Sequence, residues 1–136
     1  MCKVLIFAVL ILFAATAYAA IDSKCLDCIC KIESGCRPLA CAWDVNSNSC
    51  GYFQLKEVYW IDCGKPGGSL TACAQNKACS EGCVKAYMER YASRCTNGRT
   101  PTCQDYARIH NGGPTGCQKS ATAGYWTKVS ACYNSG

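Results

Sequence analysis

The cysteines constrain the fold of this chain more than any other feature. The sequence contains fifteen of them, and fourteen lie between Cys25 and Cys132. An even and dense set of cysteines in a small exported chain is typical of a disulfide framework, so we expect seven bridges. Their connectivity stays open, because fourteen cysteines allow very many pairings. A zinc site at Cys25, Cys28 and Cys30 is the alternative, but the chain has a single histidine and its compartment is oxidising. We therefore expect no metal and no cofactor.

The first nineteen residues predict that compartment. Lys3 precedes an apolar run from Val4 to Ala15, and Ala17-Tyr18-Ala19 has the small-residue pattern of a cleavage site. We predict a signal peptide over residues 1–19 and a secreted mature chain over residues 20–136. Cleavage of the signal peptide would remove Cys2 from the mature chain. The run is short for a bilayer crossing of about 20 residues, so we expect no membrane span.

The charge of the mature chain is mildly basic. Without Lys3 it has thirteen lysines and arginines against nine acidic residues, a net charge of +4. This excess favours approach to anionic surfaces. The basic residues are scattered and form no run, so nucleic acid is not an expected partner.

The hydrophobic pattern predicts an α+β domain. Leu26, Ile29, Cys30 and Glu33 repeat on one face of a helix that Ser23 would cap and Gly35 would end. Further helices are expected near 70–77, from a cap at Ser80, from Pro101 in a first turn, and from a cap at Ser120 to about Cys132. Residues 41–56 read as a hairpin, with the polar residues 46–49 as its turn. The total is one domain over 20–136, with about five short helices and a small antiparallel sheet.

Two acids in this framework have the features of a glycosidase pair. Glu33 continues the apolar stripe of its helix, where burial would favour the protonated form. Asp44 lies on a strand that enters a turn rich in Asn and Ser, whose donors would keep it ionised. One protonated and one ionised carboxyl group is the arrangement that glycoside hydrolysis requires. From residues alone the alternative stays open that Glu33 is a solvated helix end and Asp44 a turn former.

The segments CLDCICKIESGC, WDVNSNSCGYFQLK, VYWIDCGKPGG, CVKAYMERYA and CQDYARIHNGGPTGC resemble the invertebrate-type lysozymes, in particular their destabilase-like branch. The resemblance runs from about Cys25 to Cys132. It implies a small lysozyme-like fold and cleavage of the β-1,4 bonds between N-acetylmuramic acid and N-acetylglucosamine in bacterial peptidoglycan. It also implies Glu33 as the proton donor and Asp44 as the nucleophile or stabiliser.

The same resemblance implies a set of substrate contacts. They fall on Lys56, Tyr59, Trp60, Asp62, Tyr87, Arg94, His110, Asn111 and Gly112. Aromatic rings beside Lys and Asn suit a saccharide, which has both hydroxyl groups and apolar faces. Core packing is the alternative for Tyr87 and Trp60. The chain departs from the family at Asn46 and Asn48, where Gly and Leu are usual, and Asn is the residue that best replaces a Gly at positive φ.

Two further functions remain open from the sequence. Destabilase-like relatives are credited with isopeptidase action on ε-(γ-glutamyl)-lysine cross-links in proteins, and the positions implicated match Ser47 and Lys56, with His110 as an alternative. The alternatives without this activity are that Ser47 is a turn residue, Lys56 a saccharide contact and His110 a helix-end histidine whose hydrogen bonds are satisfied. A non-catalytic, cationic wall-binding or antimicrobial module would keep the fold and the charge without needing both acids.

Overall fold

The computed structural model describes residues 8–9, 11 and 20–135, so the predicted signal peptide lies largely outside the described residues. Within these residues the fold is α+β, with six α-helices, two short 3₁₀ turns and a two-stranded antiparallel sheet. In the described ranges no helix has the length and apolar character that a bilayer crossing requires.

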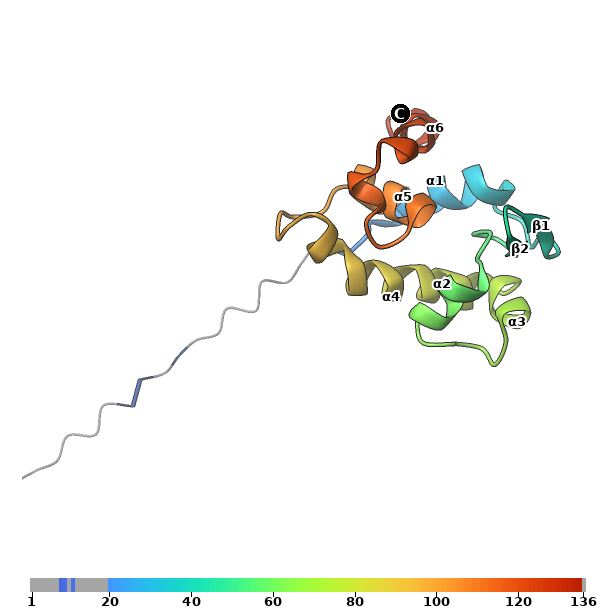
Figure 1. The fold of residues 1–136 in the computed structure, drawn as a ribbon, viewed down its shortest axis with the longest axis horizontal. Coiled ribbons are helices and arrows are strands. Elements are labelled where there is room, and N and C mark those ends of the chain that lie inside the picture. Colours follow the sequence, from blue (N-terminus) through green and yellow to red (C-terminus); the bar gives the residue numbers. More distant parts are fainter. Residues whose placement is uncertain (1–7, 10, 12–19, 136) are drawn as a thin grey trace, which may run out of the picture.

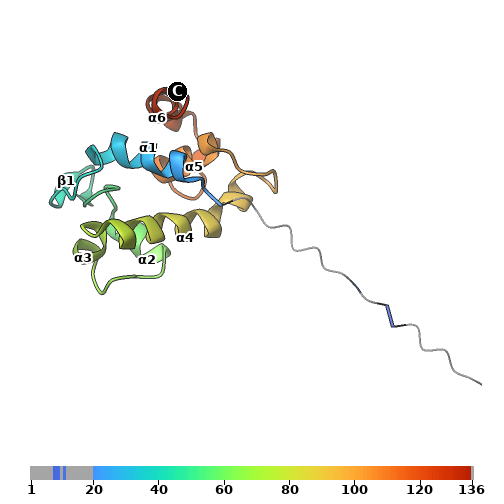
Figure 2. The ribbon, with the colours of Figure 1, turned by 180° about the vertical axis from the view of Figure 1, so that it is seen from behind.

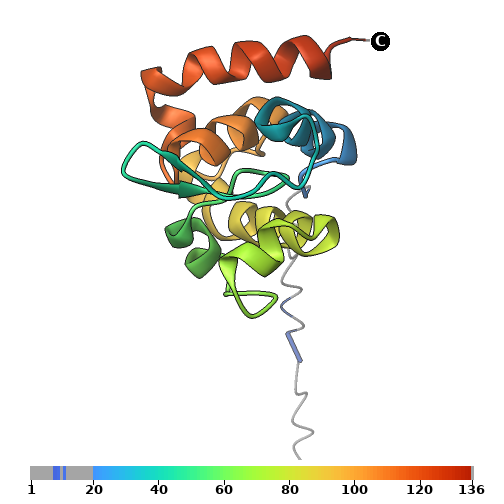
Figure 3. The same cartoon turned by 90° about the vertical axis from the view of Figure 1, so that its right-hand side faces the viewer.

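Three tiers of helices make up the body of the molecule (Figures 1 and 3). In the middle tier α1 (Ser23–Ser34) lies beside α5 (Cys103–Gly112). Helix α4 (Lys77–Cys95) runs below them with α2 (Glu57–Asp62) and α3 (Leu70–Ala74), and α6 (Ala123–Tyr133) crosses above. The view from behind shows the same order, with α4 beneath α1 (Figure 2).

The core lies between these tiers and is built largely from one face of each helix. Ile29 of α1, Val84 of α4 and Ile109 of α5 are fully buried, and Phe53 and Leu55 reach the same core from the loop after the sheet. The predicted apolar stripe of α1 is confirmed, since Leu26, Ile29 and Cys30 are all buried. The stripe therefore sets the rotation of α1, and with it the direction in which Glu33 points.

The ends of the helices correct several sequence-based predictions. Asp22, not Ser23, caps α1, because its Oδ1 accepts from the backbone N–H of Cys25 at 2.7 Å. Gly35 ends that helix as predicted, at φ 67° in the left-handed region. Asn76 caps α4, and the predicted cap Ser80 lies inside the helix, where its hydroxyl donates to the Asn76 carbonyl.

The later helices shift in the same way. Thr102 caps α5 in a capping box with Asp105, so Pro101 precedes the helix instead of lying in its first turn. Ser120 begins a 3₁₀ turn (Ser120–Thr122) that follows another at Gly116–Gln118, and α6 starts only at Ala123. Helix α2 was not predicted.

The sheet is shorter and lies earlier than predicted. Strand β1 (Ala42–Asp44) pairs with β2 (Ser47–Ser49), and a two-residue turn of Val45 and Asn46 joins them. Both turn residues have positive φ, as a type I′ turn requires, so Asn at 46 suits its position. Residues 47–49, which were assigned to the turn, form the second strand. The prediction that Asp44 enters a turn is confirmed.

All fourteen cysteines from Cys25 to Cys132 are paired, which confirms the seven bridges. Two bridges tie α1 to distant helices: Cys25–Cys103 reaches α5 and Cys28–Cys132 reaches α6. Five more close shorter loops: Cys30–Cys36, Cys41–Cys50, Cys63–Cys83, Cys73–Cys79 and Cys95–Cys117. The two long bridges fix the position of α1 in the middle tier.

The long bridges should contribute more stability than the short ones, because they restrict a larger loop of the unfolded chain. Replacing Cys28 and Cys132 (separation 104) by serine should lower the free energy of unfolding by about 4–5 kcal/mol. The matched pair Cys73 and Cys79 (separation 6) should cost about 2 kcal/mol. Guanidinium unfolding of both oxidised variants measures the difference, and an equal or larger loss for the short loop would contradict this account.

Candidate active site

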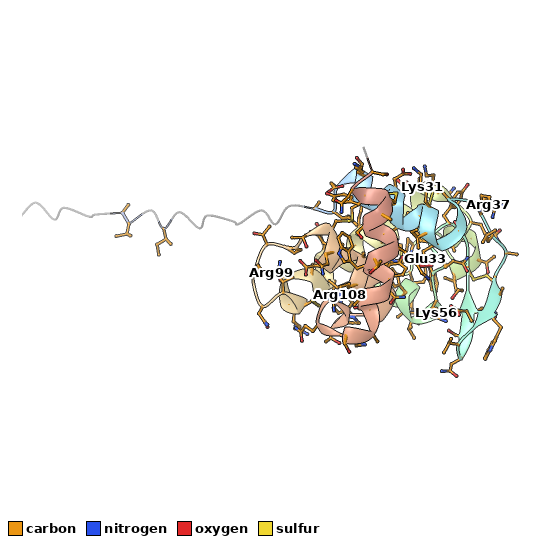
Figure 4. The ribbon with its side chains drawn as sticks, turned by 90° about the horizontal axis from the view of Figure 1, so that it is seen from above. Lys31, Glu33, Arg37, Lys56, Arg99 and Arg108 are labelled. Carbon is orange, nitrogen blue, oxygen red and sulfur yellow. A yellow bond between two sulfur atoms is a disulfide. The ribbon has the colours of Figure 1, made fainter. Side chains whose placement is uncertain are left out.

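Glu33 and Asp44 line one cleft of about 200 Å³, although they come from different elements. Glu33 lies in the last turn of α1, and Asp44 ends β1. Seen from above, Glu33 lies next to α6, with Lys56 further toward the hairpin (Figure 4). The residues that line the cleft are Glu33, Asp44, Ser49, Gln54, Lys56, Val58, Tyr59, Tyr87, His110, Asn111 and Gly113. The two acids therefore share a space into which a ligand can enter.

Glu33 is held from behind by residues of two other helices. Its side chain is 17% exposed. The Tyr125 hydroxyl, on α6, donates to Glu33 Oε1 at 2.8 Å. His110 Nε2, on α5, lies 3.9 Å from the same oxygen. One oxygen of the carboxyl group is thus engaged on the side of the helices, while the residue itself faces the cleft.

Hydrogen bonds and burial together favour the neutral form of His110. Its Nε2 lies 3.0 Å from the Phe53 carbonyl oxygen, which only accepts, so Nε2 carries the hydrogen. Its Nδ1 lies 3.0 Å from the Tyr59 hydroxyl, which donates to it when the ring is neutral. Burial lowers the pKa of His110, an effect that Glu33 and the Phe53 carbonyl partly offset. His110 is therefore neutral, with both ring nitrogens occupied.

Two stacked tyrosines form the wall below Glu33. The rings of Tyr59 and Tyr87 lie 3.7 Å apart and are nearly parallel, at 7°. Burial, followed by Tyr87 and Glu33, raises the pKa of Tyr59, and burial together with Asp62 raises that of Tyr87. Both phenols are therefore neutral at physiological pH. Tyr87 is only 3% exposed, so it packs in the core and reaches the cleft at its edge.

The surroundings of Asp44 are more open and more polar. Its side chain is 61% exposed, and Oδ2 accepts from the Ser49 hydroxyl at 3.1 Å. Lys56 Nζ lies 3.8 Å from the same oxygen. Lys56 Nζ also donates to the carbonyl of Asp44 and, at 3.4 Å, to that of Val45. Lys56 thus fixes the turn that carries Asp44 and places a positive charge beside it.

The isopeptidase candidates Ser47 and Lys56 are also in contact. Ser47 Oγ lies 3.0 Å from Lys56 Nζ. Ser47 does not line the cleft of the acids but a neighbouring pocket, together with Trp60 and Glu57. Lys56 therefore lies between the two spaces and contacts residues of each.

Four of the sequence-predicted substrate residues lie outside the cleft of the acids. Trp60 is 9% exposed and donates from Nε1 to the Pro66 carbonyl at 2.8 Å, on the side of the neighbouring pocket. The carbonyl of Asp62 accepts from Arg90, whose guanidinium is 4.0 Å from the Asp62 carboxylate. Arg94 lies exposed near the end of α4. The carbonyl of Gly112 accepts from a lysine.

Several residues of the site were missed from the sequence. Ser49, Gln54, Val58 and Gly113 line the cleft, and Tyr125 bonds to Glu33 from a position 92 residues away. The turn after His110 was a signal for Gly113, but no local pattern marks Tyr125. Within 8–9, 11 and 20–135, no three His, Cys, Asp or Glu side chains are grouped so that they could hold a metal ion.

Comparisons with known proteins are consistent with this geometry. The model of the Destabilase family matches residues 22–132. Lysozyme 1 of Crassostrea virginica is 60% identical over 111 residues, which are 82% of this chain and 59% of that protein's length. The invertebrate-type lysozyme of Ruditapes philippinarum is 51% identical over 117 residues, covering 82% of this chain and 84% of that protein.

A solved structure shares the fold as well. The chain superposes with a TM-score of 0.77 on the crystal structure of Aeromonas hydrophila PliI in complex with Meretrix lusoria lysozyme. The two sequences are 51% identical, and the match covers 82% of this chain and 89% of the other.

The buried neutral His110 should make stability depend on pH. Its folded-state pKa lies below the ordinary 6.5, so its contribution is complete above pH 6.5 and is lost as pH falls toward the folded-state value. His110→Gln keeps a donor for the Phe53 carbonyl but does not titrate. Between pH 7 and 5, the free energy of unfolding should fall more steeply for wild type, by up to about 1.4 kcal/mol per pH unit. Identical slopes in chemical denaturation would contradict a neutral His110.

Proposed function

The chain belongs to the Destabilase family and to the invertebrate-type lysozymes, which are glycoside hydrolases, and from that premise we propose that it cleaves the β-1,4 bonds between N-acetylmuramic acid and N-acetylglucosamine in peptidoglycan. The single observation that carries the proposal is the shared cleft of Glu33 and Asp44. Two carboxyl groups on opposite sides of a scissile bond are what this hydrolysis needs.

In this proposal Glu33 is the general acid. The carboxyl group gives its proton to the glycosidic oxygen as the bond to the sugar carbon breaks, and the bonding electrons leave with that oxygen. Its low exposure and its place in the cleft beside the neutral phenol of Tyr59 and the neutral imidazole of His110 support this role.

Asp44 is the ionised partner. The Ser49 hydroxyl and the Lys56 ammonium both interact with an ionised carboxylate favourably, so the group can stabilise the positive charge that develops on the sugar ring or attack it. Lys56, Tyr59, His110 and Asn111 line the cleft and are proposed to contact the saccharide. We also propose that residues 1–19 direct secretion, because seven bridges form and persist in an oxidising compartment.

The role of Glu33 is tested by Glu33→Gln, which keeps the shape of the side chain but removes the transferable proton. We expect clearing of a peptidoglycan suspension to fall at least 100-fold, since general acid catalysis typically contributes 10²–10⁴. Glu89→Gln, on the exposed side of α4, makes the same change outside the cleft and should clear at the wild-type rate. Equal clearing by wild type and Glu33→Gln would instead favour a non-catalytic cationic module.

A second activity, isopeptide hydrolysis, is favoured by one contact, that of Ser47 Oγ with Lys56 Nζ at 3.0 Å. We propose that Ser47 attacks the carbonyl carbon of an ε-(γ-glutamyl)-lysine bond while Lys56 takes the hydroxyl proton. The C–N bond breaks as that proton passes to the leaving amine, and water then hydrolyses the acyl–Ser47 ester. This step needs Lys56 as the neutral amine, whose two hydrogens suffice for the carbonyls of Asp44 and Val45. The glycosidase role of Lys56 uses its ammonium form instead, so the two activities need different protonation states of this residue. His110 suits this role less well, because both of its nitrogens are occupied.

Ser47→Ala separates the two activities. We expect release of p-nitroaniline from a γ-glutamyl anilide to be lost, because the nucleophile is gone, while clearing of peptidoglycan remains. Ser130→Ala, on α6 and outside both spaces, is the matched control and should change neither rate. Undiminished release by Ser47→Ala would rule out Ser47 as the nucleophile.

A further inference from the structure

The hydroxyl of Tyr125 is the donor that contacts the carboxyl group of Glu33 most closely. It comes from the first turns of α6 and reaches Oε1 at 2.8 Å. Tyr125 does not line the cleft, so it lies behind Glu33 with respect to a bound saccharide. Burial, and then the nearby Glu33, raise the pKa of Tyr125, so the phenol keeps its hydrogen throughout the working pH range. Tyr125 is therefore a permanent donor to this oxygen.

The other titratable groups around Glu33 do not duplicate this contact. His110, from α5, has Nε2 at 3.9 Å from Oε1, but its hydrogen is directed to the Phe53 carbonyl. The Tyr59 hydroxyl, from α2, donates to His110. Asp44 and Lys56 line the cleft from the hairpin side and pair with each other. Removing the Tyr125 hydroxyl would therefore take away a specific interaction of the carboxyl group.

We propose that Tyr125 is a positioning residue for the reaction: it occupies Oε1, so that the proton is transferred from Oε2, and it stabilises the carboxylate that the transfer leaves. The O–H bond at Oε2 breaks, the proton joins the glycosidic oxygen, and the electron pair stays on the carboxylate, whose Oε1 already accepts from Tyr125. Water attacking the sugar later returns a proton to Glu33. This inference rests on the proposed role of Glu33.

A hydrogen bond to a charged acceptor is stronger than one to a neutral acceptor, so its loss weakens Glu33 as an acid. Tyr125→Phe keeps the ring and removes only the hydroxyl. We expect kcat on a soluble glycan fragment of peptidoglycan to fall roughly tenfold, with KM unchanged because Tyr125 does not line the cleft. The basic limb of the pH–rate profile should move up by about one pH unit.

The same helix offers a matched control. Tyr133, at the other end of α6, donates to Asp22 Oδ2 at 2.8 Å, and Asp22 caps α1. Both tyrosines thus join α6 to α1 through one phenol–carboxylate hydrogen bond, but only that of Tyr125 involves Glu33. Tyr133→Phe should lower stability less, because its hydrogen bond is exposed, and should leave kcat and the pH–rate profile at wild-type values.

The outcomes separate this inference from the function on which it rests. The inference is overturned if Tyr125→Phe keeps the wild-type kcat and the wild-type basic limb of the pH–rate profile. It is also overturned if Tyr125→Phe and Tyr133→Phe lose activity equally. If Glu33→Gln remains active, the proposed function fails instead. Should Tyr125→Phe not fold, 3-fluorotyrosine placed at position 125 alone keeps the ring and makes its hydroxyl a stronger donor. The basic limb of the pH–rate profile should then move to lower pH. A basic limb that stays at its wild-type position would contradict the inference.

Discussion

The attachment of α1 to α5 and α6 by two long-range disulfides is the constraint on which the rest of the structure depends. Cys25–Cys103 and Cys28–Cys132 fix the helix at two points along one turn. Glu33 follows at the end of the same helix, and the two residues behind it come from the two bridged helices, His110 from α5 and Tyr125 from α6. The bridges that stabilise the fold thus also determine which groups surround the acid.

The side of the cleft that carries Asp44 is stabilised in a different way. The hairpin contributes only three residues to each strand, and its turn has two non-glycine residues at positive φ. Lys56 stabilises this short hairpin by donating to the carbonyl oxygens of Asp44 and Val45, and the Cys41–Cys50 bridge closes the base of the hairpin. Packed helices therefore stabilise the side of the cleft that carries Glu33, and a lysine and one local disulfide stabilise the side that carries Asp44. The contrast in exposure, 17% for Glu33 against 61% for Asp44, follows from this difference.

The sequence was a good guide wherever a local pattern decides the structure. The apolar stripe of α1, its end at Gly35 and the place of Asp44 before a turn are confirmed. Serine misled at three helix starts, because its hydroxyl can bond within a helix as well as cap one, and Ser80 does so. The disulfide pairing and the contact of Tyr125 with Glu33 join residues far apart in the chain, so no local pattern could predict them. The same reason explains why Trp60, which suits a sugar chemically, packs on the other side of Lys56.

The central claim is that a saccharide binds between Glu33 and Asp44, and a crystal structure of Glu33→Gln with a peptidoglycan oligosaccharide tests it most directly. The account predicts a glycosidic oxygen within about 2.6–3.2 Å of the side chain at position 33, with the Asp44 carboxylate on the other side of the adjacent sugar ring. An oligosaccharide bound elsewhere on the molecule, with the cleft between the two residues empty, would contradict it.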